Sequence, residues 1–476
     1  MASDPVCTEA GGGTAKKENL APAGSSTPSR TPRRKILASC LSFLGVASLG
    51  YLLGAAVIFF DLPSSSFLRK ALAGGMAWYE QQGASPSSEE SSAAPAVGQI
   101  DKPDRTCDGF TLCMYGKGST AVLINMRGEM VHQWHVPFSE LWTDPPHLRG
   151  QIRDASVYFS GGHLYPNGDL LAVIEGPINL RNPSNGHGLV KLDKDSRVLW
   201  KYPAKCHHDV DVAEDGTVYA LQNEMVDQVP PGLAYLPTPC MADFVEVISP
   251  DGKRRKSISL LEAIHDSPYA LLFRMLERPA ALDGAVPLEA SRTPPSLDDA
   301  RRRDVLHSNS IKVLSRALAP KFPLFKAGQV LISVRNLNAL VLLDPESGKV
   351  VWAARGPWLA QHDPSFLDNG RLLLFDNLGS PRGSCVLEYD PRTQAFPWNY
   401  PGDKGAPFFS EIRGMTQRLA NRNTLIVNSG AGTVFEVTPD QEVVWSCSIG
   451  HGELYCARRY APDRLPFLGR DPHARP

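Results

Sequence analysis

Three histidines stand at the start of similar strand-like segments, where their side chains could act together. His208 begins His-Asp-Val-Asp-Val, His307 lies in Asp-Val-Leu-His-Ser-Asn-Ser-Ile, and His362 begins His-Asp-Pro-Ser-Phe. His208 and His362 each precede a turn glycine, Gly216 and Gly370, by the same eight residues. A residue at one position of a repeating unit lies at one place of a radial structure. We therefore expect these histidines to converge on a common axis.

Imidazole groups in such a cluster can perform covalent and acid–base chemistry. A neutral imidazole is a competent nucleophile near pH 7, and a protonated one can donate a proton to a leaving group. Arg335, in Ile-Ser-Val-Arg-Asn-Leu, offers a planar fork of donors that suits the oxygens of an anionic group. Structural roles are the alternative. A lone histidine in a protein built from such repeating units is more often structural, and Arg335 can form an ion pair with an acidic neighbour.

The residues next to the histidines leave two questions open. His207 could take the place of His208, although strand alternation lets only one of them face the axis. The same alternation predicts that Asp209 and Asp363, which directly follow His208 and His362, point the other way.

The elements that must position these residues recur along the chain from residue 110. Each unit reads as a strand, an Asn/Asp-Gly turn, a second strand, a third strand that ends near Asp, and often a fourth strand with Trp. The units cover residues 164–200, 208–252, 307–352, 362–390, 416–445 and, in part, 121–134. Four strands per unit at spacings of roughly 40–50 residues predict a β-propeller, here all-β with six blades. A sandwich or barrel would not repeat its turns and Trp in register.

The ends of the propeller are expected to close the ring together. Residues 453–459 can supply a strand that the partial first unit lacks, which removes exposed sheet edges. Residues 259–304 form an insertion, with apolar residues at helical spacing that break near Pro268. This insertion could be a surface feature without a function or a lid over the mouth of the channel, and the sequence is consistent with both.

The N-terminal quarter has a different composition from the propeller. Residues 1–35 are rich in small and polar residues and are expected to form a disordered cytosolic tail. Residues 36–60 carry no charged residue, which predicts one transmembrane helix, because a span needs ~20 apolar residues. Basic residues precede the span, so we expect a single-pass type II signal-anchor, with a flexible stalk at 61–106 and a lumenal or extracytoplasmic propeller at 107–476. The ER, the Golgi and the cell surface are all consistent with this topology. For residues 36–60, a buried helix or a cleaved signal peptide fits the sequence less well than a membrane span.

Net charge and cysteine content bear on nucleic-acid binding, disulfide bonds and metal sites. The net charge of -1 argues against nucleic-acid binding by bulk electrostatics. Seven cysteines follow residue 60, and in an oxidising lumen we expect disulfide bonds among them. None has zinc-finger spacing, so a structural zinc is not expected. We expect neither a metal site nor a cofactor elsewhere in the chain.

Over about residues 107–460 the sequence resembles the arylsulfotransferase family of the bacterial arylsulfate type. The matching pieces, in chain order, are His208-Asp-Val-Asp-Val with Asp-Gly-Thr-Val-Tyr-Ala, Asp304-x-x-His307-x-Asn309-Ser-Ile, Ile332-Ser-Val-Arg335-Asn336-Leu, Gln361-His362-Asp with Asp-Asn-Gly-Arg-Leu-Leu-Leu-Phe-Asp-Asn, and Gln417-Arg-Leu-x-x-x-Asn-Thr-Leu-Ile. The resemblance implies a six-bladed propeller that moves a sulfuryl group from an aryl sulfate to a phenolic or other hydroxyl acceptor, without the nucleotide donor PAPS. The bacterial enzymes carry an additional N-terminal β domain, where this chain has the expected anchor and stalk.

The resemblance also implies roles for individual residues. His362 matches the nucleophile, which becomes transiently sulfurylated, while His208, His307 and Arg335 match the groups that hold the sulfuryl oxygens. Asn309 and Asn336 lie in the same motifs and are expected to bind substrate.

Two other classes of function remain open at this point. A non-catalytic extracytoplasmic propeller that serves as a binding or scaffold protein is the main alternative, but it gives no reason to keep three histidines and an arginine together. A quinone-dependent propeller dehydrogenase is weaker, because its metal–carboxylate cluster is not evident.

Overall fold

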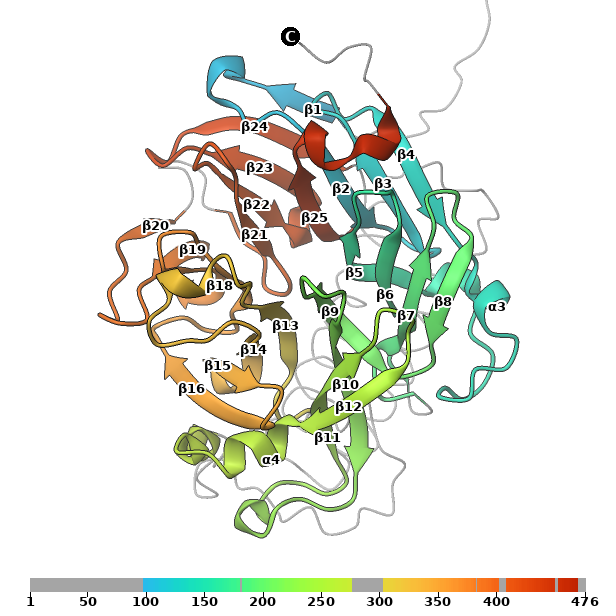
Figure 1. Ribbon diagram of the computed structural model, residues 1–476, viewed down its shortest axis with the longest axis vertical. Coiled ribbons are helices and arrows are strands. Elements are labelled where there is room, and N and C mark those ends of the chain that lie inside the picture. The colour runs from blue at the N-terminus through green and yellow to red at the C-terminus, as the bar shows by residue number, and fades with distance from the viewer. Residues whose placement is uncertain are drawn as a thin grey trace, which may run out of the picture. The chain divides into compact units, whose positions relative to one another are not determined.

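The structure is a computed structural model that describes residues 97–179, 182–275, 303–381, 383–401, 408–449 and 453–469. In these ranges the chain forms six antiparallel sheets arranged as a ring (Figure 1), which confirms the expected all-β, six-bladed propeller. The expected tail, the apolar segment 36–60 and most of the stalk lie outside the described residues. Among the residues that are described, no helix is long and apolar enough to cross a membrane.

The first three blades have four strands each, which are named in order from the inner to the outer edge of the sheet. Blade 1 contains β25 (Leu454–Tyr460), β2 (Phe110–Tyr115), β3 (Thr120–Ile124) and β4 (Met130–His135). Blade 2 contains β5 (Tyr158–Leu164), β6 (Leu170–Glu175), β7 (Gly186–Leu192) and β8 (Val198–Tyr202). Blade 3 contains β9 (Cys206–Val212), β10 (Val218–Val226), β11 (Cys240–Ile248) and β12 (Arg254–Ser259).

The other three blades follow the same order and complete the ring. Blade 4 contains β13 (Ser308–Val313), β14 (Val330–Val334), β15 (Ala339–Asp344) and β16 (Lys349–Arg355). Blade 5 contains β17 (His362–Phe366), β18 (Leu372–Ser380), β19 (Gly383–Tyr389) and β20 (Trp398–Tyr400). Blade 6 contains β21 (Met415–Arg418), β22 (Thr424–Asn428), β23 (Thr433–Val437), β24 (Val443–Ser448) and, outermost, β1 (Val97–Ile100).

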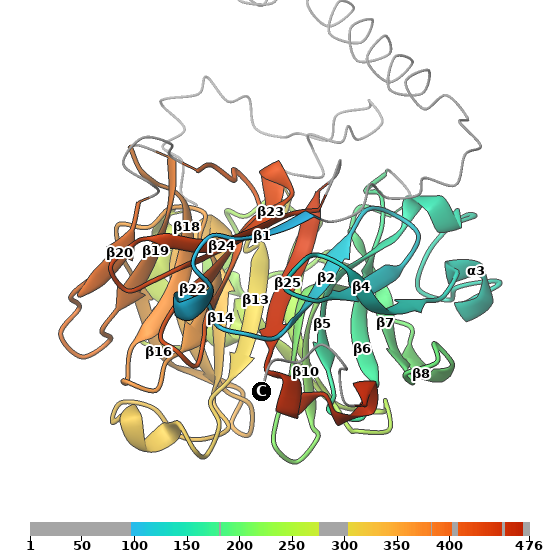
Figure 2. The ribbon, with the colours of Figure 1, turned by 90° about the horizontal axis from the view of Figure 1, so that it is seen from above.

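The innermost strands β25, β5, β9, β13, β17 and β21 contact their neighbours around the axis. Figure 2 views the ring from its edge, where β13 and β25 run along its thickness. Residues on these six strands therefore line a common channel, as the repeated histidines predict.

Short helical segments connect the strands. The α-helices are α3 (Phe138–Leu141) and α4 (Leu260–His265). The 3-10 turns are η1 (Pro103–Arg105), η2 (Asp154–Ser156), η3 (Pro231–Leu233), η4 (Ala270–Met275), η5 (Ala319–Lys321), η6 (Arg335–Leu337), η7 (Ser429–Ala431), η8 (Pro462–Arg464) and η9 (Pro466–Leu468). The beginning of the expected insertion is helical and breaks near Pro268, with α4 packed on β11 and β12. Residues 276–302, which the lid interpretation needs, lie outside the described residues.

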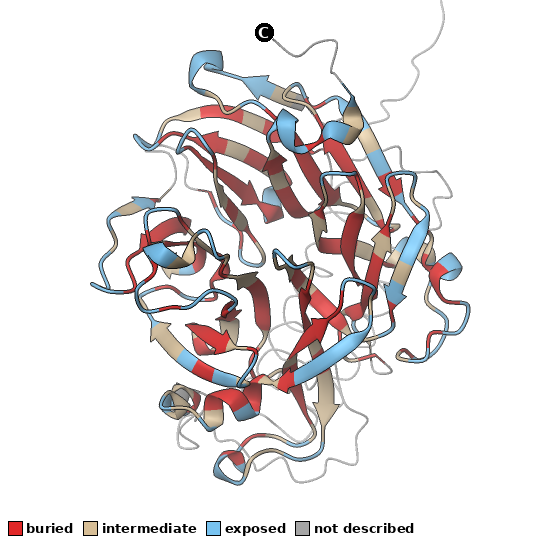
Figure 3. Ribbon diagram, viewed as in Figure 1, coloured by how far each residue is buried: buried red, intermediate tan, exposed pale blue. Residues whose placement is uncertain are grey.

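Burial follows the radial position of each strand. The middle strands β6 and β14 are buried along their whole length, because neighbouring blades cover both of their faces. The outer strands β8 and β12 are mostly exposed, and Figure 3 shows them as pale blue stretches at the rim. The apolar runs of the sequence thus form the contacts between blades.

The recurring tryptophans tie one blade to the next. Trp134 and Trp200 lie on the outer strands of blades 1 and 2, and their indole N–H groups donate to the carbonyls of Gly168 (2.9 Å) and Pro250 (3.0 Å) in the following blade. Trp445 of blade 6 likewise donates to Met126 of blade 1 at 2.8 Å. A shared inter-blade hydrogen bond explains why Trp repeats at this position.

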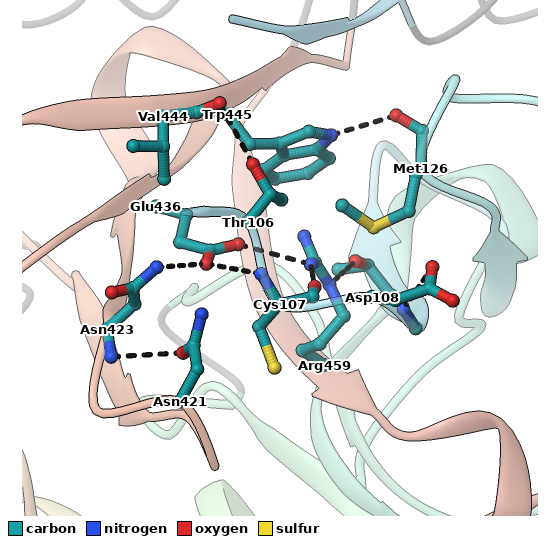
Figure 4. Close-up of polar contacts among 12 residues, drawn as sticks. Thr106, Cys107, Asp108, Met126, Asn421, Asn423, Glu436, Val444, Trp445 and Arg459 are labelled. Atoms are coloured by element: carbon teal, nitrogen blue, oxygen red, sulfur yellow. Dashed lines mark hydrogen bonds and ion pairs between the residues drawn. The ribbon is translucent and has the colours of Figure 1, made fainter. Parts of the chain in front are cut away.

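The two ends of the propeller close the ring through a buried polar cluster (Figure 4). Arg459 of β25 lies 3.4 Å from the Glu436 carboxylate of β23 and donates to the carbonyl of Cys107 at 2.6 Å. Glu436 also accepts the Cys107 main-chain N–H at 2.8 Å. The prediction that residues 453–459 complete the first blade is confirmed, while the addition of β1 to blade 6 was not expected.

The expectation of disulfide bonds is wrong. All seven cysteines beyond residue 60 fall in the described ranges, and each is a free thiol. Cys206, Cys240, Cys385 and Cys456 belong to four different hydrophobic clusters, so they cannot meet. Cys113 and Cys447 share one cluster but pack there as small apolar side chains.

Candidate active site

The inner strands carry the candidate residues to the same level of the channel. His208 lies on β9, His362 begins β17, and His307 directly precedes β13. The pairing register shifts beside all three, between β9 and β10, β13 and β14, and β17 and β18. Such bulges re-aim side chains next to functional sites. His208 and His307 also have positive φ angles of 60° and 50°, which non-glycine residues seldom adopt.

One cavity in the channel brings together residues from all six inner segments. It is lined by Ser160, Glu175, His208, Asp209, Asn309, Ser310, His362, Asp363, Arg413, Gly414, Met415 and Tyr455. The ring of His307 lies beside it, with its centroid 5.1 Å from that of His208. The structure therefore groups His208, His307, His362 and Asn309 as the sequence predicts.

His362 is held in one orientation by two acceptors on the same nitrogen. Its Nδ1 lies 2.7 Å from Asn377 Oδ1 and 2.9 Å from the Ala360 carbonyl. The Asn377 amide is itself fixed, because its N–H groups donate to the carbonyls of Ser410 (2.8 Å) and Arg413 (2.6 Å). Nδ1 must therefore carry the hydrogen, which leaves the lone pair on Nε2. Burial, together with the positive charges of His307 and Arg335, lowers the pKa of His362 to about 3, so the ring is neutral.

His307 has the opposite charge state. Its Nδ1 donates to Asp304 Oδ2 at 2.5 Å. Burial alone would lower the pKa of His307, but the charge and hydrogen bond of Asp304 outweigh it and raise the pKa above its usual value. His307 therefore holds a proton up to a higher pH than a free histidine does, with Asp304 as its counter-ion.

His208 is neutral and is bonded to the adjacent histidine. Its Nδ1 lies 2.7 Å from Nδ1 of His207, and its main-chain N–H donates to Glu175 at 2.6 Å. Burial and the neighbouring His207, His307, His362 and Arg413 hold the pKa of His208 well below its usual value. Of the two histidines, only His208 lines the cavity, as strand alternation predicts, and His207 contacts it through Nδ1.

Arg335 remains free of carboxylate partners within the described part of the chain. It begins η6, and its guanidinium makes one hydrogen bond, to Asn336 Oδ1 at 3.2 Å. Its positive charge lowers the pKa of both His307 and His362. The structural alternative, in which Arg335 pairs with an acidic residue, is therefore not observed. Asn336 uses its own amide N–H on the Asp304 carbonyl at 2.7 Å, so it supports Arg335 and Asp304 from behind.

Asp209 and Asp363 differ from the prediction, because both line the cavity. Asp363 has a φ of 49°, and this bulge breaks the alternation that would have turned its side chain away. Each carboxylate meets a buried cation at 2.5 Å, Lys312 for Asp209 and Arg458 for Asp363. These ion pairs neutralise the carboxylates that line the cavity.

Arg413 is a cavity residue that the sequence analysis missed. Arg413 lies two residues before β21 and His307 one residue before β13, and this similar position was the signal available. Its guanidinium donates to Glu453 at 3.0 Å and to the Tyr158 hydroxyl at 3.1 Å, and lies 4.1 Å above the Tyr455 ring. Tyr158 and Tyr455 stack with their centroids 4.1 Å apart. Aromatic and cationic groups therefore form one wall of the cavity.

Within the described ranges, no cluster of three or more histidine, cysteine or acidic side chains has the geometry to hold a metal ion. The arrangement instead combines a neutral imidazole with a free Nε2, an imidazolium and two arginines. These groups suit a reaction on a small anionic group.

A family comparison agrees with this arrangement. A model of the arylsulfotransferase (ASST) family matches residues 163–450. The chain belongs to the arylsulfotransferase family. The matched range contains His208, His307, Arg335 and His362, whereas Tyr158 and Tyr455 of the aromatic wall lie outside it.

Other comparisons add little to this assignment. No curated protein matches the chain. Among solved structures, a protein of unknown function from Bacteroides caccae is 12% identical, with 73% of this chain and 98% of that one covered and a TM-score of 0.45. A streptogramin B lyase is 11% identical, with 77% and 98% covered and a TM-score of 0.40. The Dos1 propeller is 10% identical, with 75% of each chain covered and a TM-score of 0.37. Similarities this low carry no argument about function.

Proposed function

We propose that the channel transfers a sulfuryl group from an aryl sulfate to a hydroxyl acceptor through a sulfohistidine at His362. In the first half-reaction, Nε2 of His362 attacks sulfur, the S–N bond forms and the bond between sulfur and the aryl oxygen breaks. In the second half-reaction the acceptor oxygen attacks sulfur and the S–N bond breaks. No nucleotide donor takes part.

One observation carries this proposal: Nδ1 of His362 faces two carbonyl acceptors, Asn377 Oδ1 at 2.7 Å and Ala360 at 2.9 Å. This contact leaves Nε2 as an unprotonated nucleophile in a ring whose pKa is lowered to about 3. The same contacts hold the ring still, so little reorganisation is needed before the attack.

Positive charge near the nucleophile supports the transfer of a sulfuryl group in particular. Sulfuryl transfer, like phosphoryl transfer, spreads negative charge over equatorial oxygens and depends mainly on positioning and electrostatics. The imidazolium of His307 and the guanidinium of Arg335 supply that charge, and His208 supplies a neutral donor.

Asn309 can bind the acceptor in the cavity. Its amide N–H donates to the Gln361 carbonyl at 2.9 Å, while its Oδ1 is buried without a hydrogen-bond partner among the described residues. A substrate hydroxyl group can donate to that oxygen.

The test is a search for the covalent intermediate. The purified full-length protein is mixed with an aryl sulfate and its intact mass is measured, with His265→Gln as a control histidine on α4. Parent and control should gain one sulfuryl group, and His362→Ala should gain none. An adduct that persists in His362→Ala but disappears in His307→Ala would move the nucleophile to His307. The absence of any adduct with a range of aryl sulfates would favour the binding-propeller alternative.

We also propose that residues 36–60 anchor the protein in a membrane, with the propeller on the lumenal or extracytoplasmic side. The uncharged stretch of 25 residues and the basic residues before it support this arrangement.

A further inference from the structure

A buried chain of ring nitrogens and carboxylate oxygens runs from His208 into the wall between blades 3 and 4. His208 Nδ1 meets His207 Nδ1 at 2.7 Å, and His207 Nε2 faces Asp243 Oδ1 at 3.8 Å. His207 and Asp243 are almost completely buried, at 1% and 0% exposed. The other oxygen of Asp243 accepts the Ser308 main-chain N–H at 2.6 Å, which fixes the carboxyl group.

The two atoms at the 3.8 Å gap share an unusual property. Within the part of the chain that the structure describes, neither His207 Nε2 nor Asp243 Oδ1 has a hydrogen-bond partner, although both are buried. An unsatisfied buried polar atom is costly, and a shift of about 1 Å would let the two atoms bond to each other. Their juxtaposition therefore extends the contact between the two histidines to a carboxyl group.

The short contact between the histidines couples their tautomers. Two neutral rings that meet through Nδ1 can hold only one hydrogen between them. If His207 carries this hydrogen on Nδ1, His208 presents an Nε2–H donor. The Nε2 of His207 is then unprotonated and accepts a hydrogen bond from a protonated Asp243. If His208 carries it, the Nε2 lone pair of His208 is free, and His207 donates to an ionised Asp243.

We propose that His207 and Asp243 form a proton relay that makes His208 the acid and then the base of sulfuryl transfer, with Asp243 storing the proton between the two half-reactions. This inference rests on the proposed function of the same site. His208 would contact the reacting oxygen, while His207 and Asp243 act through it.

The proton balance of the cycle closes without any other reactant. When the aryl oxygen leaves, it takes the proton from His208 Nε2, the His207 Nδ1 proton moves to His208, and the Asp243 proton moves to His207 Nε2. The acceptor hydroxyl later gives its proton to His208 Nε2, and the same shifts in reverse return a proton to Asp243. One proton leaves the relay and one returns.

The surroundings allow both states of the relay. Asp243 faces the Asp304 carboxylate and the His307 imidazolium, and burial, followed by the charge of Asp304, raises the pKa of Asp243 to about 7. His207 is surrounded by His208, His307, Asp304, Asp243 and the main chain of Gln222. Burial and His307 lower the pKa of His207 to about 3, against the opposing effects of Asp304 and Gln222. Glu175 lies 3.5 Å from Nδ1 of His208 and favours a hydrogen there, whereas the charges of Arg413 and His307 disfavour an additional proton on His208.

The kinetic test compares two donors that differ in the leaving group. 4-Methylphenyl sulfate needs a proton for its departing oxygen, since such phenols have a pKa of about 10 like tyrosine, whereas 4-nitrophenyl sulfate does not. Asp243→Asn and His207→Phe should slow sulfurylation by the first donor about 100-fold, a typical loss of general acid catalysis, and leave the second nearly unchanged. Asp211→Asn is the matched control, because Asp211 also accepts a main-chain N–H of β13, from Val313 at 2.8 Å, and should change neither rate. An equal loss with both donors would mean a structural role and overturn the relay.

The second test does not require turnover. Nitrogen NMR of the full-length protein labelled with ¹⁵N-histidine reports which ring nitrogen of His208 carries hydrogen. The hydrogen should move from Nε2 to Nδ1 as the pH rises through the pKa of Asp243, and should not move in Asp243→Asn. A tautomer that stays constant with pH in the parent would overturn the relay. If the tautomer moves but neither sulfate is ever transferred, the relay stands and the proposed function fails.

Discussion

Replacing Asp304 by Asn tests whether the charge of His307, and not only its position, promotes transfer. Asn can still accept the hydrogen bond that Asp304 Oδ2 accepts from His307 Nδ1 at 2.5 Å, so the ring should keep its place. The charge that raises the pKa of His307 is removed, however, and burial then lowers that pKa. In the variant, His307 should therefore lose its proton at a lower pH than in the parent.

The size of the effect follows from the change in one hydrogen bond. Bonds from charged donors are worth ~1.5–3 kcal/mol and neutral ones ~0.5–1.5 kcal/mol. A loss of about 1.4 kcal/mol in the transition state corresponds to a rate about ten-fold lower. Removal of the whole group in His307→Ala should cost more, on the order of 10²–10³-fold.

The dependence on pH distinguishes charge from structure. In the parent, the imidazolium exists below the raised pKa of His307 and is lost as pH rises through it. In Asp304→Asn the imidazolium is lost at a lower pH, so the basic limb of the pH–rate profile should move to lower pH. The assay is single-turnover sulfurylation by an aryl sulfate, followed by intact mass across the pH range. A limb that does not move, or a loss of equal size at every pH, would refute the reasoning.

Four further outcomes are expected. His362→Ala should abolish both adduct and transfer. His208→Ala and Arg335→Ala should slow transfer ~10²–10³-fold, because each removes one donor to the developing charge. The rates are measured by rapid-quench kinetics, and a parent-like rate in any of the three variants would contradict this prediction. Arg335→Lys should recover only part of the rate, since a point charge cannot replace the fork, and full recovery would count against bidentate binding. A chain that ends at residue 452 lacks β25 and should show no cooperative thermal unfolding by circular dichroism; a parent-like transition would argue against the closure seen in Figure 4. Protease added to sealed microsomes should remove the tail before residue 36 and spare the propeller, and the reverse pattern would refute the proposed topology.

The sequence by itself determined the architecture. Apolar strands, Asp-Gly turns and Trp residues recur in register along the chain, and a repeat of that kind buries its strands only by packing against further copies. Equivalent positions in a closed ring converge on its axis, so the meeting of His208, His307 and His362 followed from spacing. The closing strand also followed, because an incomplete first unit requires partners from the other end.

The tertiary structure alone decided where each side chain points and what it touches. Alternation along β9 and β17 would have turned Asp209 and Asp363 away, but bulges with positive φ turn them into the cavity. A bulge depends on pairing between strands, which a local pattern does not encode. The free state of the cysteines was likewise decided by their distribution over separate blade contacts.

Asp304 acts on His307 from within the same motif, but other states within the site depended on partners outside the histidine motifs. His362 gains its free Nε2 from Asn377, fifteen residues away, and Asp243, which faces His207, belongs to a strand with no histidine motif of its own. Arg413 enters the cavity beside Tyr455 of the closing strand. Folding brings these groups within a few ångströms, where burial and neighbouring charges set each protonation state, and sequence spacing alone cannot supply either quantity.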